Sequence, residues 1–148
     1  MSYPKFLKSN ISQNEFLSLQ KDIVIHSDFP ADDFTLEFDP RRMEQVLNNL
    51  ISNAIKYSYP GNAINIVVKR EDGYVITSVT DKGQGIPEKD IPFLFEPFRQ
   101  ASVKATHNEK GTGLGLAIVK KIIDFHKGKI EVSSKPGAGS AFTFYLPE

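Results

Sequence analysis

One segment, between Asp39 and Tyr59, constrains the fold more than any other because its apolar residues fall on one side of a helix. Asp39 is suited to be its N-cap and Pro40 its first helical residue. Apolar side chains then recur at steps of three and four, at Met43, Val46, Leu47, Leu50, Ile51 and Ala54. Most of the stability of such a helix comes from packing its apolar face against another layer. The sequence therefore predicts a layered domain built around this helix.

Alternating apolar residues predict strands on both sides of this helix. The expected strands are residues 23–26, 35–38, 64–70, 74–80, 129–134 and 140–146. Asp72-Gly73 is a strong hairpin signal between two of them. A second helix is expected from Leu114 to His126, with Gly128 near its end as a cap. Together these elements predict an α+β fold, a two-layer α/β sandwich in which helices cover one face of a mixed sheet.

The first twenty residues are expected to form a leader and a short helix. Residues 1–10 show no periodic pattern, which predicts a mobile leader. Residues 12–15, Ser-Gln-Asn-Glu, form a capping box, so a helix is expected from about Gln13 to Leu19. This leaves residues 21–148 as a single domain, a usual size for one hydrophobic core.

The composition excludes several classes of protein. Eighteen basic residues balance eighteen acidic ones, which argues against a dedicated nucleic-acid surface. The chain has no cysteine, so disulfides and thiolate metal sites are excluded. Its apolar runs are far shorter than the roughly 20 residues that cross a bilayer, and no signal-peptide pattern opens it. We expect a soluble intracellular domain.

Three groups of residues are candidates for a binding site, and the first of them suits an anion such as phosphate. Glycines alternate through residues 111–115 just before the second helix, where backbone N–H groups can bind an anion. Asn49, Asn53 and Lys56 lie within about 60° of one another on the first helix. A solvated flank would also explain this stripe, although asparagine is a poor helix former. Residues 81–86 form another glycine-spaced turn. A P-loop and a dinucleotide-binding G-x-G-x-x-G are both absent from the sequence.

The order of these motifs closely resembles the ATP-binding catalytic domain of sensor histidine kinases, within the ATPase family that includes gyrase, Hsp90 and MutL. Residues 49–57 look like the N box, 81–86 like the G1 box, 93–98 like the F box, 111–116 like the G2 box and 137–142 like the last glycine turn. The resemblance extends from about Phe38 to Pro147. It implies a Bergerat-type ATP-binding fold that takes ATP and Mg²⁺.

The resemblance also implies roles for individual residues. Asp81 would accept a hydrogen bond from the adenine amino group, with Ser140 helping through water. Tyr57 would offer adenine an aromatic face, although a buried core tyrosine is almost as good an explanation. The implied ATP-binding set is Asn49, Asn53, Lys56, Tyr57, Asp81, Gly83, Gly85, Ile86, Phe98, Lys110, Gly111, Thr112, Gly113, Leu114, Gly115, Leu116 and Ser140, with Asn49 and Lys56 catalytic and Asn49 and Asn53 as Mg²⁺ ligands. The polar residues 100–110 are expected to form a lid.

Asn49 separates the activities within this family. The gyrase-like ATPases carry at this position a glutamate that activates water, and an amide has no useful basicity near neutral pH. We therefore expect a protein histidine kinase that transfers the γ-phosphate of ATP to a histidine. Two alternatives stay open: an ATP-hydrolysing switch of the gyrase type, and a non-catalytic regulatory module that binds nucleotide.

The acceptor histidine is expected to lie on another domain. His26, His107 and His126 lack the setting of the family's phosphoacceptor, which sits on a dimerisation hairpin and is followed by an acidic residue. We expect this chain to be a catalytic domain that does not autophosphorylate alone. Its expected partners are the dimerisation domain of the same kinase and, indirectly, a response regulator. It is expected to be a monomeric cytoplasmic domain of a parent protein that is either soluble or membrane-anchored.

Overall fold

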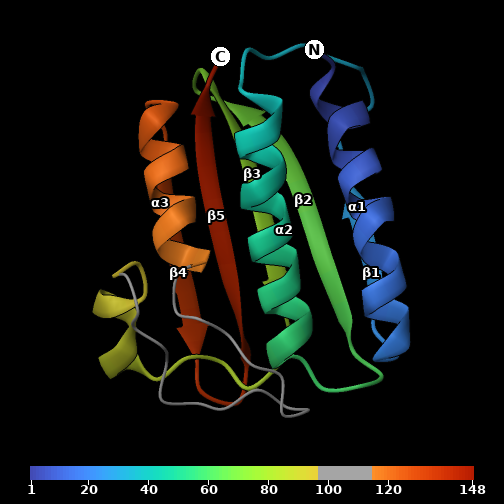
Figure 1. Ribbon diagram of the computed structural model, residues 1–148, viewed down its shortest axis with the longest axis vertical. Coiled ribbons are helices and arrows are strands. Elements are labelled where there is room, and N and C mark those ends of the chain that lie inside the picture. The colour runs from blue at the N-terminus through green and yellow to red at the C-terminus, as the bar shows by residue number, and fades with distance from the viewer. Residues whose placement is uncertain (97–114) are drawn as a thin grey trace.

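The computed structural model, which describes residues 1–96 and 115–148, has one five-stranded sheet in the order β1-β2-β3-β5-β4. The strands are β1 (Val24–Asp28), β2 (Ala63–Glu71), β3 (Tyr74–Asp81), β4 (Lys129–Lys135) and β5 (Gly139–Pro147). Only the β1–β2 pair is parallel among these strands. The helices α1 (Tyr3–Gln20), α2 (Pro40–Tyr57) and α3 (Gly115–Phe125) cover one face, and a short 3-10 helix, η1 (Glu88–Phe93), lies at one end (Figure 1). The predicted two-layer α+β sandwich with a mixed sheet is confirmed.

The helix predicted after Asp39 is α2, and it lies between α1 and α3 on the sheet (Figure 1). The Asp39 carboxylate accepts hydrogen bonds from the backbone N–H groups of Arg41 (3.0 Å) and Arg42 (3.2 Å), as an N-cap does. The buried side chains of α2 are Met43, Val46, Leu47, Leu50, Ile51, Ala54 and Ile55. They pack in one core with the inward residues of the sheet, such as Ile66 and Phe144. The predicted apolar face and cap are confirmed.

The predicted hairpin joins β2 to β3 at Asp72 and Gly73. Both residues have positive φ, +52° and +80°, as a two-residue turn of type I′ requires. The turn fixes the register Glu71 to Tyr74, and Asp81 then lies opposite Ser140 on the next strand. Asp81 is the last residue of β3, and this end of the strand is the position that matters for the site.

The expectation of a mobile leader before a short helix is wrong. Helix α1 runs from Tyr3 to Gln20, and Tyr3 and Leu7 are fully buried in the core shared with the sheet. The periodic pattern was hidden because polar residues share the buried face of this helix. Asn14 donates to the Asn10 carbonyl (2.9 Å) and to Asn48 Oδ1 on α2 (3.0 Å), so hydrogen bonds replace apolar contacts at that helix interface.

The strand expected at residues 35–38 is also wrong. Thr35 forms an isolated bridge with Ser2, and the neighbouring backbone groups pair with the start of the chain. Tyr3 N–H donates to the Phe34 carbonyl (3.1 Å), and Leu36 N–H donates to the Met1 carbonyl (3.1 Å). The segment therefore holds the beginning of α1 in place instead of extending the sheet.

Helix α3 ends in a Schellman motif that differs from the predicted glycine cap. The residue with left-handed φ is Lys127, at +59°, and the Gly128 N–H donates to the Ile123 carbonyl (3.0 Å). Gly128 is needed for space, since a Cβ there would lie 2.0 Å from the Tyr145 carbonyl oxygen.

None of the helices in the described ranges is both long and apolar enough to cross a membrane.

Candidate functional site

Asp81 is a buried acid at the end of β3, and it lies where two segments of the chain meet. The residue is only 4% exposed. Its Oδ1 accepts a hydrogen bond from the Gly83 N–H (2.9 Å), and its Oδ2 accepts one from the Ser140 hydroxyl (2.8 Å). Burial raises the pKa of Asp81, and these hydrogen bonds partly oppose that effect. Each carboxylate oxygen keeps a second lone pair that can accept a further hydrogen bond.

The turn at residues 81–86 is held between α2 and the loop that joins β4 to β5. The Gln84 N–H donates to the carbonyl of Tyr57, the last residue of α2 (3.2 Å). The Gly137 N–H, from the β4–β5 loop, donates to the Gln84 carbonyl (2.6 Å). Backbone groups therefore fix this turn from both sides.

The glycines of this turn are required by the close approach of other backbone segments. A Cβ on Gly83 would lie 2.0 Å from the Tyr57 carbonyl oxygen. A Cβ on Gly85, whose φ is +74°, would lie 2.0 Å from the Lys135 carbonyl oxygen. The glycine spacing in this motif thus has a local cause: neighbouring backbone occupies the space that a side chain would need.

The polar stripe of α2 points toward the same end of the molecule. Asn49, Asn53, Lys56 and Tyr57 are all half-buried. The Asn49 Oδ1 lies 3.2 Å from where a Cβ on Gly115 would be, so this side chain faces the start of α3. The Lys56 Nζ lies 5.3 Å from the centroid of the Tyr57 ring. The stripe is therefore partly enclosed and is not a fully solvated flank.

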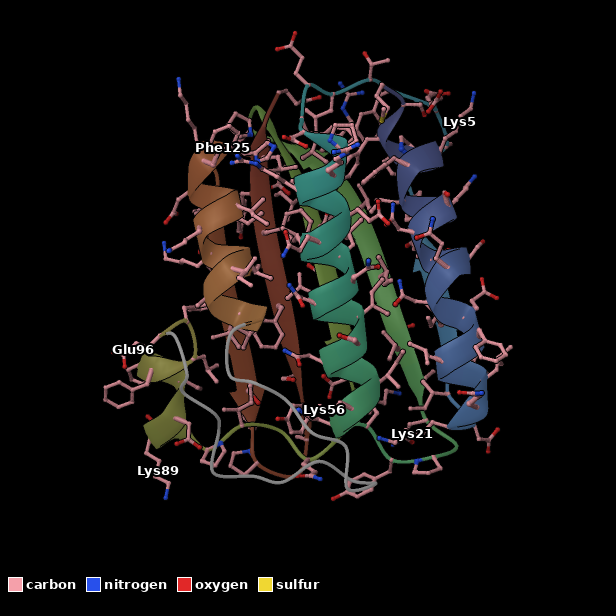
Figure 2. The ribbon with its side chains drawn as sticks, viewed as in Figure 1. Lys5, Lys21, Lys56, Lys89, Glu96 and Phe125 are labelled. Carbon is pink, nitrogen blue, oxygen red and sulfur yellow. The ribbon has the colours of Figure 1, made fainter. Side chains whose placement is uncertain are left out.

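Lys21, from the turn after α1, holds the end of α2 that carries Lys56 and Tyr57; Figure 2 shows Lys21 and Lys56 at that end. The Lys21 ammonium donates to the carbonyls of Ile55 (2.8 Å) and Lys56 (2.9 Å). Carbonyls in the last turn of a helix lack partners within the helix and carry the negative end of its dipole. An ammonium at this position therefore stabilises the helix end.

The structure brings most of the described site residues to one end of the sheet. Asp81, Gly83 and Ser140 are in direct contact, and the hydroxyl of Ser140 bonds Asp81 itself. Ile86 and Leu116 are half-buried and pack against the core. The predicted residues Phe98, Lys110, Gly111, Thr112, Gly113 and Leu114, and the predicted lid at 100–110, lie outside the described residues.

Three side chains that support this end were not predicted: Lys21, Asn62 and Ser134. Asn62 Nδ2 donates to the Lys82 carbonyl (3.2 Å) in the 81–86 turn. Ser134 Oγ accepts from the Ile86 N–H (2.7 Å) on that turn. These residues stand far from the turn in sequence, and single polar residues beside strands and turns carry no distinctive pattern. The tertiary contacts alone identify them.

The arrangement suits a purine nucleotide and a hard cation. Asp81 can accept from an exocyclic amino group, and its burial excludes the water that would compete. Asn49 and Asn53 offer amide oxygens one helical turn apart, which are ligands that Mg²⁺ takes together with phosphate oxygens. Within residues 1–96 and 115–148, no three histidine, aspartate or glutamate side chains are close enough to hold a metal ion. The asparagine pair fits Mg²⁺ that is shared with a bound phosphate.

Comparisons with known proteins agree on the family. Residues 38–148 match the family described as histidine kinase-, DNA gyrase B-, and HSP90-like ATPase. The sensor histidine kinase RcsC of Escherichia coli is 44% identical over 123 residues, covering 83% of this chain and 12% of that protein. The circadian input-output histidine kinase CikA of Synechococcus elongatus is 42% identical over 110 residues, covering 74% of this chain and 15% of that protein. This chain therefore spans only a small part of these curated relatives.

A solved structure indicates the same family. The nucleotide-free catalytic domain of histidine kinase ThkA superposes with a TM-score of 0.85 and 31% sequence identity, covering 99% of this chain and 93% of that chain. The matched family region begins at residue 38 and includes α2, the 81–86 turn and the start of α3. On its sequence, its fold and the placement of these motifs, this chain belongs to the histidine kinase-, DNA gyrase B-, and HSP90-like ATPase family.

Proposed function

We propose that this chain is the catalytic domain of a sensor histidine kinase that binds Mg-ATP and transfers the γ-phosphate to a histidine on a separate dimerisation domain. The observation that carries the proposal is Asp81: a buried carboxylate held by Gly83 and Ser140 and paired with no cation in the part of the chain that the structure describes. A buried acid is costly unless its surroundings satisfy it, and acids retained in this way are frequent at functional sites.

In the proposed complex, adenine lies at Asp81 and the phosphates extend between α2 and the start of α3. Lys56 places a positive charge near the phosphates, and Asn49 and Asn53 are the proposed Mg²⁺ ligands. When bound, Mg²⁺ neutralises charge on the phosphates during transfer. Asn49 cannot remove a proton from water, which favours transfer to a protein side chain over hydrolysis.

The acceptor is proposed to lie outside this chain. His26 is exposed on β1. Both ring nitrogens of His126 are engaged, one with the Asp39 N–H (3.0 Å) and the other with the Ile122 carbonyl (2.8 Å). Neither has the setting of a phosphoacceptor. The structural relative ThkA has been solved in a complex with the response regulator protein TrrA, and we extend that partnership to a response regulator for the parent kinase of this chain.

Radiolabelled ATP tests this proposal. The chain alone should neither label itself nor release phosphate quickly, because phosphoryl transfer requires an acceptor held in line. Adding the dimerisation domain of its own kinase should restore labelling on the histidine of that domain. Asn53→Ala should abolish labelling. Asn48→Ala is the matched control, because Asn48 bonds Asn14 on α1 and is not a proposed ligand.

Two outcomes would contradict the proposal. Label on His26, on His126 or on His107, which lies outside the described residues, would show in the isolated chain that the acceptor is internal. Rapid phosphate release without any acceptor would instead favour the gyrase-type ATPase.

A further inference from the structure

The hydroxyl of Ser134 joins two segments of backbone on either side of Asp81. Ser134 lies near the end of β4 and is half-buried. Its Oγ accepts a hydrogen bond from the Ile86 N–H (2.7 Å) and donates one to the Gly139 carbonyl (3.0 Å). A single side-chain atom therefore bridges the end of the 81–86 turn and the start of β5.

These two segments supply the hydrogen-bond donors that hold Asp81. The Gly83 N–H belongs to the 81–86 turn, and the Ser140 hydroxyl follows Gly139 directly on β5. The distance between the turn and β5 decides whether both donors reach the carboxylate at once. The β3–β5 pairing places Asp81 opposite Ser140, and the bridge made by Ser134 ties the far end of the turn to β5.

Backbone segments are tightly packed around the Ser134 bridge. A Cβ on Gly85 would lie 2.0 Å from the Lys135 carbonyl, and a Cβ on Gly139 would lie 2.1 Å from the Asp81 carbonyl. The 81–86 turn thus lies in close contact with the end of β4 at Lys135 and with the start of β5 at Gly139, and the Ile86 N–H would lose its partner without the hydroxyl. An unpaired backbone donor in such a place is costly, so the turn would shift to find another acceptor.

The preceding residue, Ser133, provides an internal comparison. Successive side chains of a strand point to opposite faces, and Ser133 is exposed where Ser134 is half-buried. The two serines share the same strand and the same chemistry. Of the two serines, only Ser134 hydrogen-bonds the 81–86 turn among the described residues.

We infer that Ser134 is a positioning residue for adenine recognition: its hydroxyl fixes the 81–86 turn against β5 so that Asp81 presents its remaining lone pair to the purine. This inference rests on the proposed function, since it assumes that adenine is read at Asp81. Ser134 does not itself touch the nucleotide.

The first test needs no nucleotide. Amide hydrogen exchange at Ile86 should become about tenfold faster in Ser134→Ala, because its N–H loses its acceptor, and should be unchanged in Ser133→Ala. Ser134→Thr should restore protection, since threonine keeps the hydroxyl and suits a strand. Unchanged exchange at Ile86 in Ser134→Ala would overturn the inference at its first step.

The second test measures the affinities for ADP and for adenosine by calorimetry. Ser134→Ala should weaken both by the same factor, about tenfold, so that their ratio stays constant, and Ser134→Thr should remain within about threefold of the unmodified chain. A general loss of structure would not be rescued by threonine. Unchanged adenosine affinity in Ser134→Ala, with Ile86 exchange accelerated, would overturn the recognition role alone. Failure of the unmodified chain to bind either ligand would overturn the proposed function itself.

Discussion

Helix α2 is held differently at its two ends. At the far end from Asp81, side chains make the contacts: Asp39 caps α2, and His126, at the end of α3, accepts a hydrogen bond from the Asp39 N–H. The Arg42 guanidinium lies 4.2 Å from the centroid of the Phe125 ring. Because Nε2 accepts from the Asp39 N–H, Nδ1 is the ring nitrogen that donates to the Ile122 carbonyl.

At the other end, backbone segments also contact one another directly. The carbonyl of Tyr57 accepts from Gln84, and the carbonyl of Gln84 accepts from Gly137. Glycines are required where these segments meet, because a Cβ on Gly83 or Gly85 would lie 2.0 Å from a carbonyl oxygen. The comparison indicates that the far end contributes stability through replaceable side chains, whereas the end at Asp81 fixes a geometry that few substitutions can preserve.

The largest effect is expected for Gly85→Ala. This substitution both forces a side chain into positive φ and places its Cβ against the Lys135 carbonyl, so it should lower the free energy of unfolding by about 3 kcal/mol or more. Gly137→Ala is the matched control: its φ is +79°, close to the +74° of Gly85, but nothing lies within 4 Å of the added Cβ. That variant should lose only about 1 kcal/mol. Equal losses in urea denaturation would contradict the importance of backbone contact.

Asp81→Asn should weaken ADP binding by about 1–3 kcal/mol without unfolding the chain, because the amide spoils the acceptor for the adenine amino group. Asparagine can still accept from the Gly83 N–H and donate to the Ser140 hydroxyl, so the site itself should persist. Calorimetry on both proteins measures the difference. Unchanged ADP affinity would show that Asp81 does not bind the nucleotide.

The same variant should change how stability depends on pH. Burial raises the pKa of Asp81 in the folded state, so the folded protein holds this proton more tightly than the unfolded chain. Stability from this group is therefore greatest below the unfolded carboxyl pKa of about 3.9 and is lost as pH rises through the folded pKa. The Asp81→Asn variant has no carboxyl group at this position, so its stability does not fall with rising pH for this reason. The difference in unfolding free energy between variant and unmodified chain should grow in favour of the variant with rising pH and then level off, and a constant difference would contradict the assignment.

A smaller effect is expected at the far end. His126→Ala removes two hydrogen bonds and should lower the free energy of unfolding by about 1–2 kcal/mol while ADP affinity stays unchanged. His26→Ala is the control, since His26 is exposed on β1, and it should stay within about 0.5 kcal/mol. A loss of ADP affinity in His126→Ala would show that the two ends are coupled and that the comparison is too simple.

The sequence predicts helices and turns correctly where their local sequence pattern agrees with their packing in the tertiary structure. The helix after Asp39 and the hairpin at Asp72 have both a strong local signal and the expected packing, and both are confirmed. Helix α1 was missed because Asn10 and Asn14 occupy its buried face, and their partners lie on another turn or another helix. An apolar periodicity cannot reveal a buried face that carries hydrogen-bonded asparagines.

The residues of the site likewise divide into those that the sequence predicts and those that it does not. Asp81 and its glycines form a contiguous motif, and their place in a buried turn could be anticipated from the sequence. Ser134 and Lys21 act on that end from other strands and turns, and nothing in their local sequence marks them. The reason is physical: positioning depends on contacts between segments distant in the chain, and only the folded structure brings those segments together.

The most direct test of this account is an amide chemical-shift titration of the unmodified chain with Mg-ADP. Large shifts are expected at the end of α2 near Asp81, at the amides of Tyr57, Gly83 and Gly85, and none at the far end, at Asp39 and Arg42. Shifts concentrated at Asp39 and Arg42, or no shifts at saturating nucleotide, would contradict the claim that this end of α2 is where the nucleotide binds.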